Sequence, residues 1–145
     1  MSAGTGIWHS EMNPDGGKDV RLVQMWVVPD MPRIKPGYEQ LDIGKELDKG
    51  GLVPVASGRS KHTAIKIRQA GATLYASRLK KGESVTVPDA PYVHAYVAKG
   101  SVSLEEAGLL EEGDAARLTA AGARRLTAGE RGAEVLLWEM DSVVV

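Results

Sequence analysis

The sequence predicts an all-β protein, a β-sandwich or small barrel, and three observations carry this prediction. Glycine (17 residues) and proline (7 residues) recur along the 145-residue chain, which is typical of many short strands joined by turns. From residue 62 onward, short alternating apolar segments follow one another with turns every ~8–12 residues. Phenylalanine is absent, so the core must be built mainly from Val, Leu, Ile and Ala, a composition that leans towards strands.

The first forty residues are expected to form an arm that precedes the main domain. The stretch GIWHSEMN is expected to be a strand, and NPDGG a turn. Residues 20–28 (VRLVQMWVV) are apolar at nearly every position, which predicts a strand buried on both faces. The proline-rich stretch DMPRIKPGYEQ reads as an extended linker. The predicted division is therefore an arm at 1–40 and a domain at 41–145.

The domain at 41–145 is expected to consist of short strands in series. LDIGKELDKGG predicts one helical turn, and LVPVASGRSK predicts a loop with a short strand. Further strands are expected in TAIKIRQ, ATLYASRL, ESVTVP, YVHAYVAKG and SVSL, and after the Glu-Gly-Asp turn of LLEEGD. In the Ala-rich stretch AARLTAAGARRLTAGERG, glycines oppose a helix, so we expect strand–turn–strand. ARRLT and AEVLLWEM are expected to be separate strands, divided by the turn AGERG. The end, DSVVV, is short and apolar.

Composition argues against several classes of partner. The net charge is −1, so no global basic field attracts nucleic acid. No apolar run reaches the ~18 residues of a membrane helix. The chain contains no cysteine, which excludes disulfides and thiolate metal ligands and fits a cytoplasmic location. We therefore expect a cytoplasmic protein with neither nucleic acid nor membrane as a partner.

His9 and Glu11 are the first candidate for chemistry, because a single serine separates them. Residues two apart in a strand point to the same face, so the pair makes half of a metal site. A mononuclear non-haem iron site needs about three protein ligands. The other histidines, His62 and His94, do not lie two residues from any other. Three alternatives stay open: the pair binds a metal within this chain alone, the pair is a remnant of an incomplete site, or a second polypeptide completes the site.

Several stretches resemble the pirin family, whose members are bicupins. GTGIWHSEMN, RLVQMWVVPD and PGYEQ, in that order, resemble the middle of a pirin, and IKIRQAGATLYASRLKKGE resembles the start of the second pirin domain. YVHAYVAKGSVSL with LLEEGDAARL is similar to the paired strands of a cupin barrel. The resemblance implies an RmlC-like cupin fold for 41–145. It also implies that 1–40 is the tail of a preceding cupin, so that the chain is the C-terminal portion of a pirin.

The resemblance also implies a ligand set. The first pirin cupin binds a metal ion, typically iron, through a His-x-His segment and through the His and Glu of the HSE motif, which here are His9 and Glu11. The His-x-His segment is absent from this sequence. The first hypothesis is therefore a non-catalytic or incomplete cupin that acts through association, as a homodimer or with a complementary N-terminal cupin chain. The alternative is a quercetin 2,3-dioxygenase-type oxygenase whose iron or other divalent metal site is completed by another chain, with Glu11 as its candidate catalytic residue.

A third hypothesis concerns a small-molecule ligand in the main domain. His94 alternates in phase with Tyr92 and Tyr96. If their shared face lines the barrel, these three residues form a possible pocket; otherwise His94 is a core or rim histidine. The resemblance implies that this second barrel lacks a metal.

The apolar stretch at 20–28 also predicts association. Leaving its Val, Leu, Met and Trp side chains in water would cost about 1.5–3 kcal/mol each. The arm is therefore expected to fold back onto its own domain, to exchange with a second copy, or to pair with a separate partner.

Overall fold

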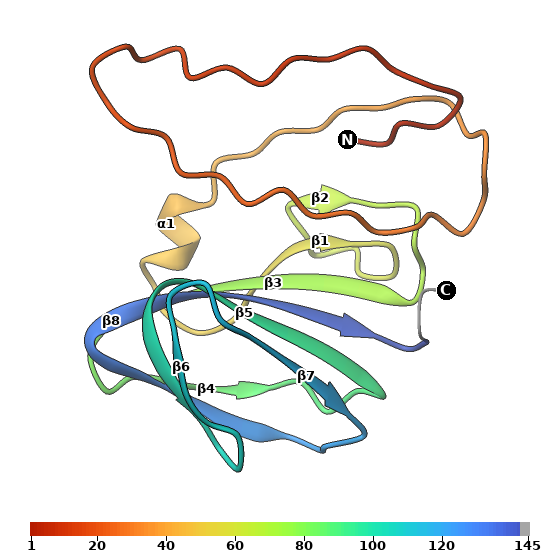
Figure 1. Ribbon diagram of the computed structural model, residues 1–145. Coiled ribbons are helices and arrows are strands. Elements are labelled where there is room, and N and C mark those ends of the chain that lie inside the picture. Colours follow the sequence, from red (N-terminus) through yellow and green to blue (C-terminus); the bar gives the residue numbers. More distant parts are fainter. Residues whose placement is uncertain (143–145) are drawn as a thin grey trace.

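The computed structural model describes residues 1–142, and its regular structure is almost entirely β (Figure 1). The elements are α1 (Gly44–Leu47), β1 (Val53–Ser57), β2 (Ile65–Lys66), β3 (Ala72–Leu79), β4 (Ser84–Val87), β5 (Tyr92–Leu104), β6 (Gly108–Glu111), β7 (Ala115–Thr119) and β8 (Arg124–Met140). The all-β prediction is confirmed, as are the short helical turn and the strand–turn–strand prediction for AARLTAAGARRLT, whose two strands are β7 and the start of β8. The apolar end at 143–145 lies outside the described residues.

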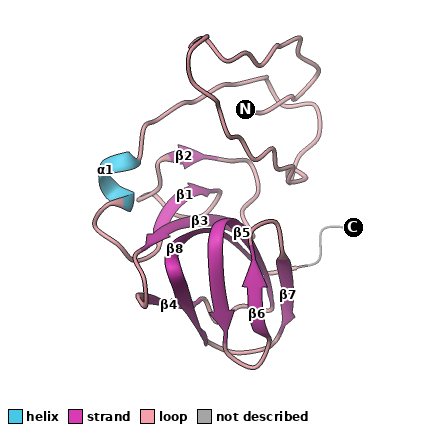
Figure 2. Cartoon of the chain, turned by 60° about the vertical axis from the view of Figure 1, so that its left-hand side comes forward, coloured by secondary structure: helices cyan, strands magenta, loops and turns pink. Residues whose placement is uncertain are grey.

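Two long strands, β5 and β8, hold the sheet together. The strand order is β2-β1-β3-β8-β5-β6, with β4 paired to β8 and β7 paired to β5. The second half of β8 pairs with β3, and its first half pairs with β4. The first half of β5 pairs with β7, and its second half pairs with β6. Each of these two strands therefore pairs with different neighbours along its two halves. The sheet bends over on itself into two facing layers, and β5 and β8 pass from one layer to the other around a single interior (Figures 1 and 2).

The prediction that turns divide these two strands is wrong. YVHAYVAKG and SVSL form one strand, β5, and the stretch AGERG lies inside β8. Gly100 (φ +77°) and Gly132 (φ +73°) take up the left-handed backbone at these points. The pairing of β5 with β8 shifts register on either side of Gly100, between Val97 and Lys99 and between Gly100 and Val102. Glycine here bends a continuing strand, because a bulge needs the same backbone freedom as a turn.

Gly100→Ala is expected to be strongly destabilising. A Cβ at Gly100 would stand 2.1 Å from the carbonyl oxygen of Gly132, a backbone atom that cannot rotate away. The matched control is Gly108→Ala, since Gly108 also has positive φ (+89°) but has nothing within 4 Å of its Cβ position. In urea unfolding, the control should lose about 1–2 kcal/mol from backbone strain. Gly100→Ala should lose about 1–3 kcal/mol more from overpacking; equal losses would contradict the bulge.

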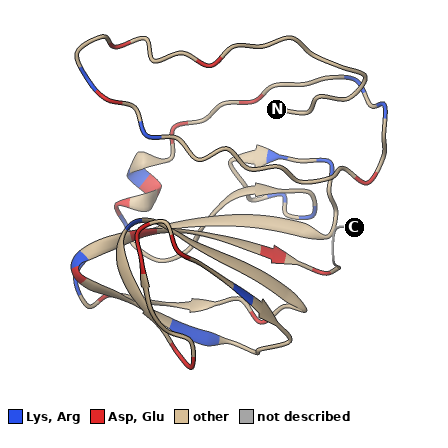
Figure 3. Cartoon of the chain, viewed as in Figure 1, with Lys and Arg blue, Asp and Glu red and all other residues tan. Residues whose placement is uncertain are grey.

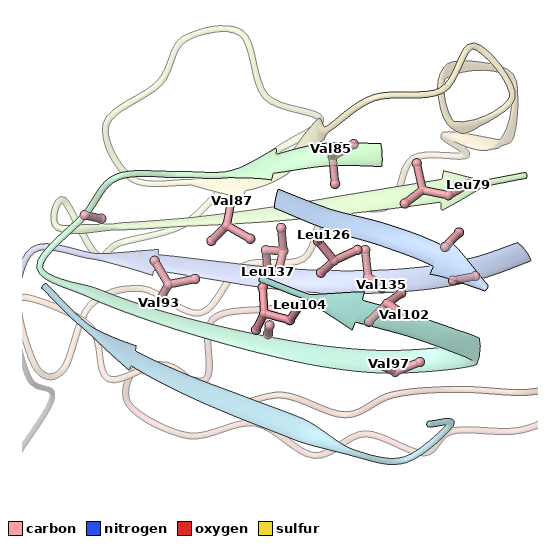
Figure 4. Packing of buried hydrophobic residues seen from close by; sticks show 14 residues of the cluster. Leu79, Val85, Val87, Val93, Val97, Val102, Leu104, Leu126, Val135 and Leu137 are labelled. Carbon is pink, nitrogen blue, oxygen red and sulfur yellow. The ribbon is translucent and has the colours of Figure 1, made fainter. Parts of the chain in front are cut away.

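The core lies between the two layers of the curled sheet. Figure 4 shows its labelled side chains converging from both layers. Leu104, Leu126 and Leu137 are at most 1% exposed. The cluster comprises Leu79, Val85, Val87, Ala90, Val93, Ala95, Val97, Val102, Leu104, Leu126, Ala128, Ala133, Val135 and Leu137.

The predicted strands of the arm are not formed. Before Gly44, the only ladder contact in the described chain is a single bridge between Ser2 and Gly37. Residues 20–28 were expected to be buried on both faces, but Leu22 is 62% exposed and Trp26 is 89% exposed. The arm is drawn as coil that stands away from the sheet (Figure 2). A strand buried on both faces needs neighbours on both faces, and this chain does not supply them.

Part of the arm nevertheless fastens to the edge of the sheet. We call residues 25–39 the strap. The backbone N–H of Asp30 donates to the carbonyl of Arg68 (2.8 Å), and the Asp30 carboxylate accepts from the N–H of Ala70 (2.6 Å). The Glu39 carboxylate accepts from the N–H of Lys66 in β2 (2.9 Å). Because β2 ends the strand order, the strap covers an edge whose backbone groups would otherwise face water.

The strap also contacts the outer face of the sheet. The indole N–H of Trp138, in β8, points at the sulfur of Met25 across 3.3 Å. The side-chain amide of Gln69 donates to the carbonyl of Val28 (2.9 Å). The arm therefore folds back through a few mainly polar contacts, while most of its apolar side chains stay exposed. The division at residues 40 and 41 stays a prediction. Among residues 1–142, no helix is long and apolar enough to cross a membrane.

Candidate functional site

His9 and Glu11 lie side by side on the arm. Their nearest atoms, Nδ1 of His9 and Oε1 of Glu11, are 3.9 Å apart. The side chains are 41% and 49% exposed, so neither is held by packing. The chain here is coil, but the i, i+2 spacing still brings an imidazole and a carboxylate together, as the sequence predicts. The pair offers one nitrogen and one carboxylate donor group to a cation.

These two donors do not fit a divalent metal ion by themselves. Within residues 1–142, no three His, Cys, Asp or Glu side chains are grouped closely enough to hold a metal. Iron, zinc and similar ions take about three or more protein ligands in stable sites. A metal on His9 and Glu11 would therefore need donors from another polypeptide.

Exposed apolar side chains flank this half-site along the sequence. Trp8 is fully exposed, and Met12 is 83% exposed. Further along the arm, the exposed large apolar residues are Val20, Leu22, Val23, Met25, Trp26, Val28, Met31, Tyr38 and Leu41. So many exposed large apolar side chains on one segment are unusual in a soluble protein and favour an interaction role for the arm.

The face that His94 shares with Tyr92 and Tyr96 points away from the core. Along β5, burial alternates from Tyr92 onward, and the residues between His94 and its two tyrosine neighbours point into the core. Tyr92, His94 and Tyr96 therefore share the outer face, where all three are half-buried. His94 pairs across the ladders with Trp138 on β8 and with Arg117 on β7. His94 therefore lies half-buried on the outer face of the sheet, and the pocket of His94, Tyr92 and Tyr96 stays a hypothesis.

His94 should titrate below its ordinary pKa of about 6.5. Burial lowers the pKa of His94 first, and the positive charge of Arg117 lowers it further. Below pH 6.5 the unfolded chain then binds more protons than the folded one, so stability falls as pH drops through the lowered pKa. NMR titration of the His94 ring should show Arg117→Gln raising this pKa part of the way towards its ordinary value. An unchanged titration in that variant would contradict the contact.

The sequence did not predict a polar wall inside the barrel. Thr73, Tyr75 and Ser77 alternate along the inner face of β3, and Glu139 lies opposite Thr73 on β8. Burial and the Glu139 carboxylate raise the pKa of Tyr75. The Ser77 hydroxyl is buried without a hydrogen-bond partner in the described structure. The only signal in the sequence was hydroxyl side chains at every second position of ATLYASRL.

Arg59 lies at one end of this row of polar side chains, beside the end of β8. Its guanidinium group binds the Glu139 carboxylate and, at 2.7 Å, the carboxylate of Asp141. Hydrogen bonding to Asp141 is the main cause of a raised pKa for Arg59. The contacts tie the loop after β1 to the end of β8. Because these charges are already paired with each other, we interpret the arrangement as a structural ion-pair network and not as a binding site.

Two family models match the chain. Residues 54–140 match the model described as the quercetinase C-terminal cupin domain, and residues 1–27 match the model described as pirin. The first match spans the barrel, and the second spans the half-site and most of the exposed apolar stretch.

The chain is similar to several named proteins. It is 48% identical over 143 residues to a putative quercetin 2,3-dioxygenase of Mycobacterium tuberculosis, an alignment that spans 98% of this chain and 58% of that protein. It is 34% identical over 109 residues to a quercetin 2,3-dioxygenase of Escherichia coli K12, spanning 72% of this chain and 44% of that protein. The chain thus spans roughly half the length of these relatives.

Solved structures show the same fold. The crystal structure of YhhW from Escherichia coli superposes with a TM-score of 0.68 at 24% identity and covers 83% of this chain and 50% of that one. A second structure, bacterial pirin YhhW in complex with nickel(II), gives a TM-score of 0.66 at 24% identity, covering 79% of this chain and 48% of that one.

Proposed function

Because the chain belongs to the pirin family of cupin proteins, we propose that it works through association with another polypeptide, and that the association completes a divalent-metal site on His9 and Glu11. One observation carries the proposal. An imidazole and a carboxylate lie 3.9 Å apart and exposed, and residues 1–142 offer no third donor beside them. A partner that brings two further nitrogen or oxygen donors would make a four-ligand site.

Exposed apolar side chains support the association. Val20, Leu22, Trp26 and Val28 are each more than half exposed, and they follow the half-site on the same arm. Burying such a side chain is worth about 1.5–3 kcal/mol. Two partners fit this surface: a second copy, which gives a homodimer with two His and two Glu, or a complementary N-terminal cupin chain that brings its own histidines.

Replacing Leu22 and Trp26 together by serine is expected to weaken association. Sedimentation equilibrium of the wild-type chain, alone and mixed with the part of a full-length relative that lies outside the match, should show a complex in at least one case. The double variant should move the population towards the monomer, because its contact surface has lost two large apolar groups. Leu109→Ser is the matched control, since Leu109 is 65% exposed but lies on β6. A wild-type chain that stays monomeric in both conditions would contradict the proposal.

A second candidate function is a quercetin 2,3-dioxygenase-type oxygenase. The names of relatives that are 48% and 34% identical favour it. The metal would be iron or another divalent ion, and the pirin solved with nickel(II) shows that one member with this fold binds such an ion. In this candidate, Glu11 is both a ligand and the candidate catalytic residue. Oxygen uptake with quercetin by the metal-loaded complex, and none by the monomer, is the expected result.

The proposal also places the protein in the cytoplasm, without a nucleic-acid or membrane partner. A net charge of −1 and the absence of cysteine support this placement.

A further inference from the structure

A half-open cavity of about 320 Å³ lies between the strap and β2, and neither His9 nor Glu11 is in its lining. Its walls are residues 35–39 of the strap, residues 65, 66 and 68 at the edge of the sheet, and the first two residues of the chain. We propose that this cavity binds a small polyanion, a molecule that carries phosphate or carboxylate groups. The volume lies at the lower end of the ~300–1,000 Å³ that small-ligand sites occupy.

Three cationic side chains line the cavity. Lys35 comes from the strap, and Lys66 and Arg68 come from the edge of the sheet. Lys66 and Arg68 lie two residues apart in an extended stretch where exposed and half-buried positions alternate, so both point to the same side. Figure 3 shows basic positions both on β2 and on the coil that runs above it. None of the three forms an ion pair with the part of the chain that the structure describes.

The acidic residue in the lining does not cancel these charges. Glu39 is the one carboxylate side chain in the lining, and its Oε2 accepts the backbone N–H of Lys66 at 2.9 Å. That contact holds the strap against β2 and leaves the ammonium group of Lys66 without a carboxylate partner. The side chains of the lining therefore carry three positive charges against one negative charge. An anion with two or more charges matches that excess.

The walls of the cavity are held in place before a ligand binds. Ser2 and Gly37 exchange two backbone hydrogen bonds of 2.8 and 3.1 Å, which fix the strap wall. The backbone carbonyl of Arg68 accepts the N–H of Asp30 at 2.8 Å, which fixes the opposite wall. A ligand would therefore order mainly the three long side chains, whereas the backbone around them is already placed. The planar guanidinium of Arg68 suits a two-pronged contact with an oxyanion, and the lysines act as point charges.

Calorimetric titration of the full chain with pyrophosphate and, separately, with citrate tests the proposal. Protein and buffers are first freed of metal on a chelating resin, because both probes bind divalent ions. One probe should bind with a stoichiometry of one per chain, and added salt should weaken it, since the contacts are between charges. Preference for pyrophosphate assigns a phosphate-bearing ligand, and preference for citrate assigns a polycarboxylate. If neither probe binds at millimolar concentration, the proposal is overturned.

Three variants distinguish binding in this cavity from non-specific electrostatic attraction and from binding at the metal half-site. Arg68→Gln should weaken binding about tenfold, a change that corresponds to one charge contact worth roughly 1.4 kcal/mol. Lys45→Gln removes an equal charge from α1 and should leave binding unchanged. An equal loss in both variants would overturn the site, because the attraction would then be non-specific. His9→Ala should bind the probe as the wild type does, so failure here is distinguishable from failure of the metal proposal.

Discussion

Glu11→Gln is expected to lower the affinity of the completed site for a divalent metal by at least about 100-fold. Glutamine keeps the size of the side chain but removes the charge that a hard or borderline cation requires. Changes to residues that only orient a ligand already cost ~10–100-fold in metal affinity, so the loss of a ligand itself should cost no less. Competition of the assembled protein with a chromophoric chelator measures the effect.

His9→Asn should give a loss of similar size, because both changes remove a donor from the same half-site. Glu46→Gln is the control, since Glu46 is an acidic residue on the short helix α1. The sedimentation profile should be unchanged in all three variants, which separates the loss of metal from the loss of association. Full metal affinity in Glu11→Gln would contradict the assignment of the half-site.

Leu137→Ala is expected to lower the free energy of unfolding by about 2–5 kcal/mol. The Leu137 side chain is fully buried, and β8 holds it between the two layers of the sheet. Alanine at this position would leave a void, because β8 is paired on both sides and cannot close in on it. Urea unfolding followed by tryptophan fluorescence measures the loss.

Leu109→Ala is the control for this change. Leu109 is 65% exposed on β6, and substitutions at such positions usually fall within about 0.5 kcal/mol of the wild type. The denaturant dependence of the unfolding free energy should stay constant between the two variants, as expected when only stability changes. Similar losses at the two positions would mean that the core does not lie between the layers as described.

Local pattern accounts for the elements that the sequence predicted well. β3 (Ala72–Leu79) coincides with the predicted stretch ATLYASRL, because Gly71 and the turn after Leu79 bound an alternating segment. Local pattern could not predict that β5 and β8 continue as single strands through their internal glycines. A glycine with positive φ looks the same in sequence whether the strand turns back or continues through a bulge, and only pairing across the sheet distinguishes the two.

The arm shows a different limit of sequence reasoning. The apolar composition of residues 20–28 reports the environment in which this stretch is stable. It does not report whether the same chain provides that environment. In the structure of the single chain, Trp26 is 89% exposed, Met25 approaches Trp138 of the sheet, and Arg21 pairs with Glu112 beside β6 at 3.0 Å. The prediction of burial therefore becomes a prediction about a partner.

In the candidate site, too, some features depend on local backbone and others on tertiary structure. His9 and Glu11 lie close together in coil, whereas the sequence analysis expected them to share one face of a strand that is not formed. Which face His94 occupies depends on the register of β5 against β8, which sets Val93 and Ala95 towards the core. Register is a tertiary property, and a shift of one residue exchanges the two faces of a strand. The cationic cavity between the strap and β2 also depends on tertiary structure, because its lining comes from segments that lie far apart in the sequence.

Native mass spectrometry after supply of a divalent metal shows whether assembly completes the site on His9 and Glu11, because it reports assembly and metal content on the same particle. The sample is the wild-type chain, measured alone and with the complementary part of a longer relative. We expect metal-free monomers, and assemblies that carry one ion for each completed site. Monomers that each hold one ion, or stable assemblies that stay metal-free, would contradict it.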